Sequence, residues 1–228
     1  MKPLLITLFV LGLLFLFAAY RVSSFFYFKK HQSKYHFYQM FPYEFNYPLV
    51  FKGNIYGNIL FIIALGFLSA FYIVFSNSTF ATNSVTTITM VIFIIIVSTA
   101  FLALLLMPLN YLRTHAIVAI LSLTIATVLP LLIVFYIYQS IQNHQKFNEP
   151  YYMDVISIVL AGLMAVFMLV VLLNPKATFK IYMDKALDSE GKEMFIRPRI
   201  IYMAFNEWIA IFTTFLSPLP LVILILLL

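Results

Sequence analysis

The residues most able to do chemistry in this chain are four histidines and eight acids, and they form no familiar catalytic or metal-binding pattern. His31 and His36 are five residues apart, so a helix would place them on different faces. His115 stands beside Arg113, and the acids between 184 and 193 alternate with lysines. Zinc sites need closely spaced ligands and zinc proteases carry HExxH, and neither pattern occurs. We therefore expect each histidine, His115 included, to be an interfacial side chain.

Motifs for nucleophilic catalysis and phosphate binding are missing as well. The chain has no GxSxG elbow, no Walker P-loop and no paired acids of the kind that hold Mg²⁺. It has no cysteine, which excludes disulfides and catalytic thiols. We expect no cofactor, no metal and no catalytic residue, and we interpret the protein as non-enzymatic. A lipid-modifying enzyme is the alternative, in which Asp154 or His115 would act at the leaflet surface.

The composition indicates a membrane protein. Of 228 residues, 64% are hydrophobic and 10% are charged, whereas soluble domains contain about half and a quarter, respectively. A hydrocarbon core about 30 Å thick requires about 20 residues of helix, and six segments without charges approach or reach that length. We predict one all-α membrane domain over 1–228, a polytopic integral membrane protein with six transmembrane helices. They cover about residues 4–20, 58–75, 86–109, 116–138, 155–173 and 208–228.

The distribution of basic residues predicts the orientation in the membrane. Twelve of the fourteen Lys and Arg residues fall in alternate connections, five of them in 21–57 and six in 174–207. Because Lys and Arg are retained on the cytoplasmic side, both termini are predicted to lie outside. The first segment could also be a cleaved signal peptide, although Phe17 stands where a cleavage site needs a small residue.

The two large connections differ in character. The first, 21–57, interleaves basic residues with Phe and Tyr, so we expect it to extend the first helix briefly and then lie along the anionic inner leaflet. The second, 174–207, is polar and admits either a short hairpin or a broken amphipathic helix. The predicted contacts with lipid or with a protein partner are Lys29, Lys30, Lys34, Arg197 and Arg199.

Small residues and prolines inside the spans indicate how the helices pack. Small residues four apart let helices approach closely, and a proline removes a backbone donor and kinks its helix. The predicted packing and kink residues are Gly66 with Ala70, Ala161 with Ala165, Pro130, Pro218 and Pro220. No charged residue lies within the predicted spans, which argues against a proton-coupled or sodium-coupled carrier.

The cysteine-free layout, rich in Phe, Tyr and Ile, resembles that of membrane proteins of low-GC Gram-positive bacteria. Some of those proteins accompany secretion systems or confer immunity to toxins. The resemblance implies a bacterial cytoplasmic membrane and a function by association, as an accessory subunit or a protective protein. The net charge of +6 follows from the cytoplasmic bias, so nucleic acid is not an expected partner. The alternative is a small-solute transporter or substrate-binding membrane subunit, with a site between helices kinked at Pro130 and Pro218.

Single cysteines introduced at Phe80, Thr114, Phe147 and Glu190 test the predicted orientation, because the chain offers no background thiol. An impermeant reagent should label the cysteines at 80 and 147 in intact cells. Those at 114 and 190 should react only after the membrane is opened. The reverse pattern, or labelling at both 80 and 114 in intact cells, would contradict the orientation.

Overall fold

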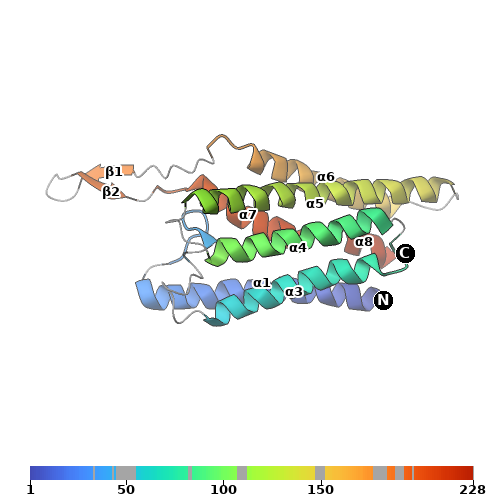
Figure 1. Ribbon diagram of the computed structural model, residues 1–228, viewed down its shortest axis with the longest axis horizontal. Coiled ribbons are helices and arrows are strands. Elements are labelled where there is room, and N and C mark those ends of the chain that lie inside the picture. The colour runs from blue at the N-terminus through green and yellow to red at the C-terminus, as the bar shows by residue number, and fades with distance from the viewer. Residues whose placement is uncertain are drawn as a thin grey trace.

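The computed structural model describes residues 1–32, 34–42, 44, 55–81, 84–106, 112–146, 152–176, 184–187, 193–196 and 198–227. Within these ranges, six helical stretches are long and apolar enough to cross a membrane, which confirms the predicted six helical spans. Two helices, α7 and α8, share the sixth of them. The elements are α1 (Lys2–His31), α3 (Ile55–Ser76), α4 (Ser84–Leu106), α5 (Leu112–Lys146), α6 (Tyr152–Leu172), β1 (Asp184–Leu187), β2 (Glu193–Ile196), α7 (Tyr202–Leu216) and α8 (Leu219–Leu227) (Figure 1).

Two of the helices are much longer than the apolar segments that predicted them. α1 has 30 residues and α5 has 35, so at about 1.5 Å per residue both exceed a hydrocarbon core about 30 Å thick. No Gly or Pro interrupts residues 21–31, and α1 continues through them, as the sequence allowed. It ends at Gln32, whose backbone is left-handed (φ 52°) and donates its N–H to the Phe28 carbonyl.

The sixth span lies at the centre of the bundle. In its most apolar stretch 67% of the residues are buried, against 28% in the first and fifth spans. α7 packs on α5, and α8 packs on α6. Around them, α1 packs on α3, α3 on α4, α4 on α5 and α5 on α6 (Figure 1). The last segment of the chain therefore forms the core against which the earlier helices assemble.

The sixth span is broken into two helices, where the sequence predicted one helix kinked at Pro218 and Pro220. Ser217 and Pro218 separate α7 from α8. Pro218 has no N–H to donate, so the helical hydrogen-bond ladder cannot run through it. The Ser217 hydroxyl donates to the Thr214 carbonyl at 2.7 Å and lies 2.6 Å from the Tyr72 hydroxyl. These bonds satisfy polar groups at the break, because an interior without water offers them no other partner.

A two-stranded hairpin occupies part of the second large connection. β1 and β2 pair antiparallel, with Asp184 opposite Ile196 and Leu187 opposite Glu193. Of the two predicted alternatives the structure has the hairpin, so the all-α class applies to the bundle and not to this connection. The strands lie beyond the end of the helices (Figure 1).

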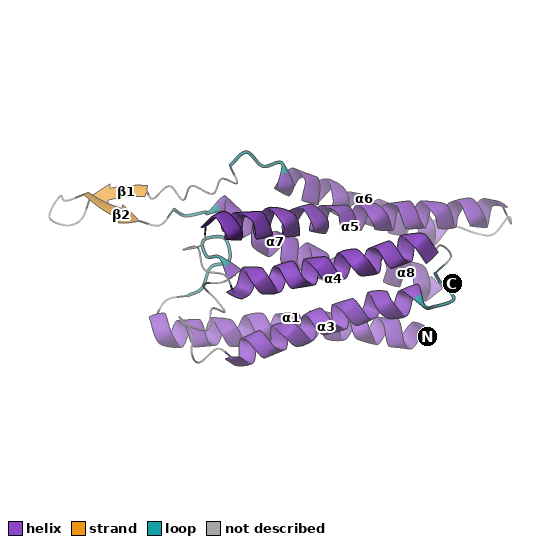
Figure 2. Cartoon of the chain, viewed as in Figure 1, coloured by secondary structure: helices purple, strands orange, loops and turns teal. Residues whose placement is uncertain are grey.

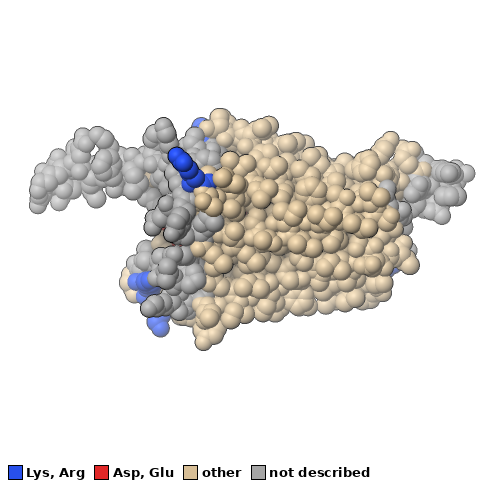
Figure 3. Space-filling model, in the orientation of Figure 1, with Lys and Arg blue, Asp and Glu red and all other residues tan. Residues whose placement is uncertain are grey.

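The two ends of the bundle differ in charge. Both termini lie at the same end, as six passes require (Figure 2). On the visible face the middle of the bundle shows neither basic nor acidic side chains, and the blue side chains gather at the end opposite the termini (Figure 3). Among the residues whose exposure the structure describes, the exposed basic side chains of that end include Lys29, Lys30, Lys34, Arg113, Lys176 and Arg199.

Gly12 is the glycine that brings two helices together. A Cβ added to Gly12 would lie 3.7 Å from the Phe67 Cβ and 3.8 Å from the Ala64 carbonyl oxygen, both on α3. A Cβ added to Gly66 would have nothing within 4 Å. The close approach of α1 and α3 therefore occurs at Gly12, and among the described residues none lies close to the Cβ position of Gly66.

Gly12→Leu should destabilise the bundle, and Gly66→Leu is its matched control. Both changes add the same side chain to a helix, so the gain in helix propensity cancels between them. Overpacking at the α1–α3 contact should make Gly12→Leu less stable than Gly66→Leu by about 1–3 kcal/mol. Thermal unfolding in detergent, followed by circular dichroism, measures the difference. A larger loss for Gly66→Leu would place the important contact on the outer face of α3.

Candidate functional site

A buried pair of ionisable side chains joins the fourth and sixth spans. His115, in the first turn of α5, places Nε2 at 2.9 Å from Glu207 Oε1 on α7, and both side chains are fully buried. The prediction that His115 is an interfacial side chain is therefore wrong. The second carboxylate oxygen, Oε2 of Glu207, is buried without a hydrogen-bond partner. Ionisable groups at such depth are rare in membrane helices and usually mark a function or a structural joint.

The sequence contained a signal for Glu207 that hydropathy alone does not detect. The predicted sixth span began at 208, because the polar residues Asn206 and Glu207 precede it. The buried positions of α7 nevertheless continue upstream at helical spacing, through Met203, Ala204, Glu207, Trp208 and Ile211. Glu207 thus lies on the inward face of α7, and extending the helical periodicity past the apolar segment would have found it.

The described part of the first connection, residues 34–42 and Glu44, packs beside the His115–Glu207 pair. The Trp208 indole N–H donates to the Tyr35 hydroxyl at 2.9 Å and to the Met40 carbonyl at 3.1 Å. The Tyr35 hydroxyl in turn lies 3.0 Å from the carbonyls of Met40 and Phe41, to which it donates. The expectation that this segment lies along the leaflet is wrong for Tyr35 and Phe41, which are buried. Residues 33, 43 and 45–54, to which the same prediction applies, lie outside the described residues.

Tyr35 keeps its proton in this setting. Burial, as the largest cause, raises the pKa of Tyr35 well above its usual value; the Trp208 hydrogen bond opposes the rise, and the charges of Glu44 and Glu207 add to it. A neutral phenol can donate its proton to a carbonyl while accepting the indole N–H. The hydrogen-bond directions above therefore hold across the physiological pH range.

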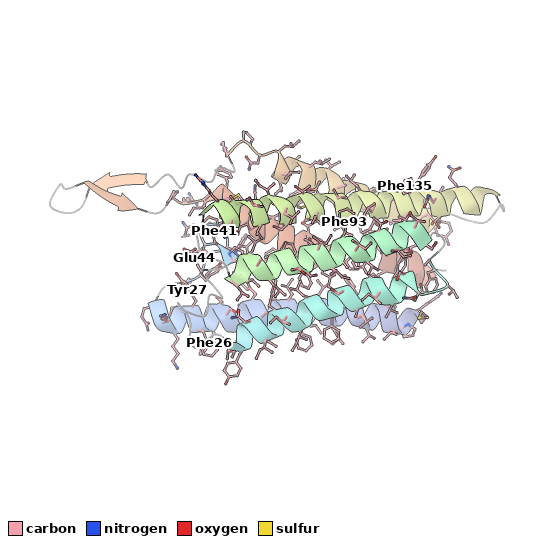
Figure 4. All side chains as sticks on the ribbon, viewed as in Figure 1. Phe26, Tyr27, Phe41, Glu44, Phe93 and Phe135 are labelled. Atoms are coloured by element: carbon pink, nitrogen blue, oxygen red, sulfur yellow. The ribbon has the colours of Figure 1, made fainter. Side chains whose placement is uncertain are left out.

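Phe41 and Glu44 complete the boundary cluster, which comprises Tyr35, Phe41, Glu44, His115, Glu207 and Trp208. The Phe41 ring meets the His115 ring edge to face, with centroids 5.8 Å apart. Its backbone N–H donates to Glu44 Oε2 at 2.8 Å. Phe41 and Glu44 lie together at the end of the bundle near the start of α5 (Figure 4). A buried aromatic ring thus packs against the His115 side of the pair.

The geometry suits structural linkage better than catalysis. His115 and Glu207 share a hydrogen bond, and neither is accessible to a substrate. Asp154, the other residue considered for surface chemistry, is 2% exposed and lies in the first turn of α6, where the helix dipole favours a carboxylate. Asp154 and Glu207 each lie one residue before a predicted span, but α6 and α7 begin earlier than predicted and therefore include them. Among the residues that the structure describes, no three His, Asp or Glu side chains gather as a metal site would need.

The predicted contact residues lie around this cluster. Lys29 and Lys30 are exposed in the last turn of α1, and Lys34 and Arg199 are exposed on the segments that follow α1 and precede α7. Arg197 lies outside the described residues.

Five of the predicted packing and kink residues are buried. Ala161 and Ala165 are buried on α6. Pro130 is buried within α5, and Pro218 and Pro220 are buried at the α7–α8 break.

Comparisons of the chain with protein-family models, with curated proteins and with solved structures found no match.

A double-mutant cycle on His115 and Glu207 measures the strength of the interaction between these two side chains. His115→Ala and Glu207→Ala should each cost about 3 kcal/mol, because each leaves a buried polar partner without its bond. The double variant should lose less than the sum of the two. Glu207→Gln, which keeps the shape and an acceptor, should lose less than Glu207→Ala. Unfolding in detergent provides the measurement, and strictly additive losses would mean that the two side chains do not interact.

Proposed function

We propose that the chain is a non-enzymatic, multi-pass membrane protein that acts by association, with a basic docking face at the end opposite its termini. The docking face comprises Lys29, Lys30, Lys34, Arg113 and Arg199. We place this face in the cytoplasm and both termini outside, in the cytoplasmic membrane of a bacterium, because Lys and Arg concentrate there. An accessory subunit or a protective protein would use such a face.

The observation that carries this proposal is the hydrogen-bonded anchoring of residues 35–41. A connection that merely rests on lipid needs no buried hydrogen bonds to the bundle. Here the Trp208 indole and the Tyr35 hydroxyl fix the backbone at Met40 and Phe41. The second large connection is hydrogen-bonded to the first as well, because Ile201 donates its N–H to the Tyr38 carbonyl at 2.9 Å. A basic surface held in one conformation binds a partner at a lower entropic cost.

The charge of this face favours an acidic partner. Six basic side chains are exposed at this end, and no acidic side chain is exposed among those whose exposure the structure describes. An acidic segment on a partner protein would meet several cations at once, which steers association and selects against basic partners. The anionic inner leaflet surrounds the same face and would orient the protein for that encounter.

A small-solute site at the α7–α8 break is the second proposal, and it has less support. Discontinuous helices often form binding sites in transporters, and the Thr214 hydroxyl at this break is buried without a partner. The hydroxyls of Tyr72 and Ser217, however, bond to one another. Their bonding capacity is largely used within the protein.

Zero-length carbodiimide cross-linking in native membranes tests the docking face, because it joins an ammonium group only to a carboxylate in contact with it. We expect Lys29 or Lys34 to become linked to an acidic segment of a partner. The variant Lys29→Glu/Lys34→Glu should reduce recovery of that partner at least tenfold. Lys2→Glu, which makes the same change at the other end of α1, should leave recovery unchanged.

The variant Tyr35→Phe tests the anchoring of the first connection separately from the charge of the docking face. It removes the hydroxyl that holds Met40 and Phe41 but keeps all the lysines, so we expect weaker partner recovery with unchanged membrane insertion. Recovery of the chain alone from cross-linked membranes would overturn the proposal. Equal losses for Lys2→Glu and for Lys29→Glu/Lys34→Glu would do the same.

A further inference from the structure

An open, apolar groove lies between the end of α6 and the start of α7. Its volume is about 790 Å³, within the range of about 300–1,000 Å³ that is usual for ligand sites. Val166, Phe167 and Val170 of α6 form one wall, and Phe205 of α7 forms the other. Val170 is 65% exposed, so the groove opens toward the lipid.

The groove exists because α6 packs along α8 and diverges from α7. α6 packs closely on α8, while α7 packs mainly on α5. One polar contact bridges the gap between α6 and α7: the Asn206 amide donates to the Val171 carbonyl at 3.0 Å. That bond engages the carbonyl at the end of α6 and leaves the rest of the groove apolar.

The size of the groove indicates a lipid chain as its occupant. A helix with its side chains is about 10–12 Å across, so 790 Å³ equals only about 8 Å of helix, or one to two turns. A partner helix would therefore make little contact here. A flexible acyl chain follows an open apolar groove without a fixed cross-section, and it is the apolar molecule present at this depth of a membrane.

The mouth of the groove carries a positive charge. Lys176, four residues beyond the end of α6, is exposed and places Nζ 5.5 Å from the centre of the Tyr202 ring. Tyr202 begins α7, whose first turn has no side-chain cap, so its backbone N–H groups add positive potential. The groove therefore pairs an apolar interior with a cationic rim at the depth of the headgroups.

We propose that this groove binds one anionic phospholipid, with an acyl chain along Val166, Val170 and Phe205 and the phosphate beside Lys176. None of the docking-face residues lines the groove, so either proposal can fail without the other. Its effect is to fix a lipid on an exposed part of α6.

Native mass spectrometry of the full chain, titrated with phosphatidylglycerol or phosphatidylcholine of the same acyl chains, tests the proposal. We expect the first bound phosphatidylglycerol to be retained more tightly than phosphatidylcholine. Lys176→Ala should weaken phosphatidylglycerol binding about fivefold, the effect of one cation near an anionic surface. Lys2→Ala, at the other end of α1, should leave this first lipid unaffected.

Val170→Trp fills the groove and should abolish the first binding step for both lipids. Leu163→Trp is its matched control, because Leu163 lies seven residues earlier on the same face of α6, is 63% exposed and does not line the groove. Equal retention of the two lipids, equal effects of Lys176→Ala and Lys2→Ala, or unchanged binding in Val170→Trp would each overturn the proposal. If the protein forms dimers and Val170→Trp dissociates them, a second copy of the chain occupies the groove instead.

Discussion

Two adjacent residues of α7 hold together three segments that are distant in the sequence. Glu207 bonds His115 at the start of α5, and Trp208 bonds Tyr35 in the first connection. Water competes poorly for hydrogen bonds in a buried, apolar setting, so such contacts are costly to break and fix the geometry of the groups that make them. The end of the bundle is therefore a rigid joint, and the arrangement of the exposed basic residues around it depends on these bonds.

The bundle shows two ways of accommodating polar groups in an apolar solvent. At the joint, the basic side chain of His115 is paired with the acidic side chain of Glu207, and the Phe41 ring packs against His115. At the α7–α8 break, the Ser217 hydroxyl bonds the Thr214 carbonyl and meets the Tyr72 hydroxyl. In both places the side chains occupy bonding groups that would otherwise be exposed to hydrocarbon. Helix discontinuity and buried charge can thus coexist with a closely packed interior.

The spans were predictable because the hydrocarbon core imposes a minimum length on each apolar segment. The extension of α1 was partly predictable, since residues 21–31 contain no helix breaker. The boundary cluster was not predictable from local pattern. His115 and Glu207 are 92 residues apart, and Tyr35 and Trp208 are 173 apart. Such pairs depend on which helices become neighbours, and hydropathy carries no information about that. The groove beside Lys176 depends in the same way on the divergence of α6 from α7.

The position of Trp208 has an optical consequence. It is the only tryptophan in the chain, so ultraviolet emission excited at the red edge of protein absorption arises from this one indole. Tyr20 and Tyr35 lie with ring centroids 5.8 and 6.1 Å from it, close enough to pass excitation to it efficiently. The protein therefore carries a built-in fluorophore at the joint of α7 with the first connection, and its spectrum reports the polarity and packing of that place alone.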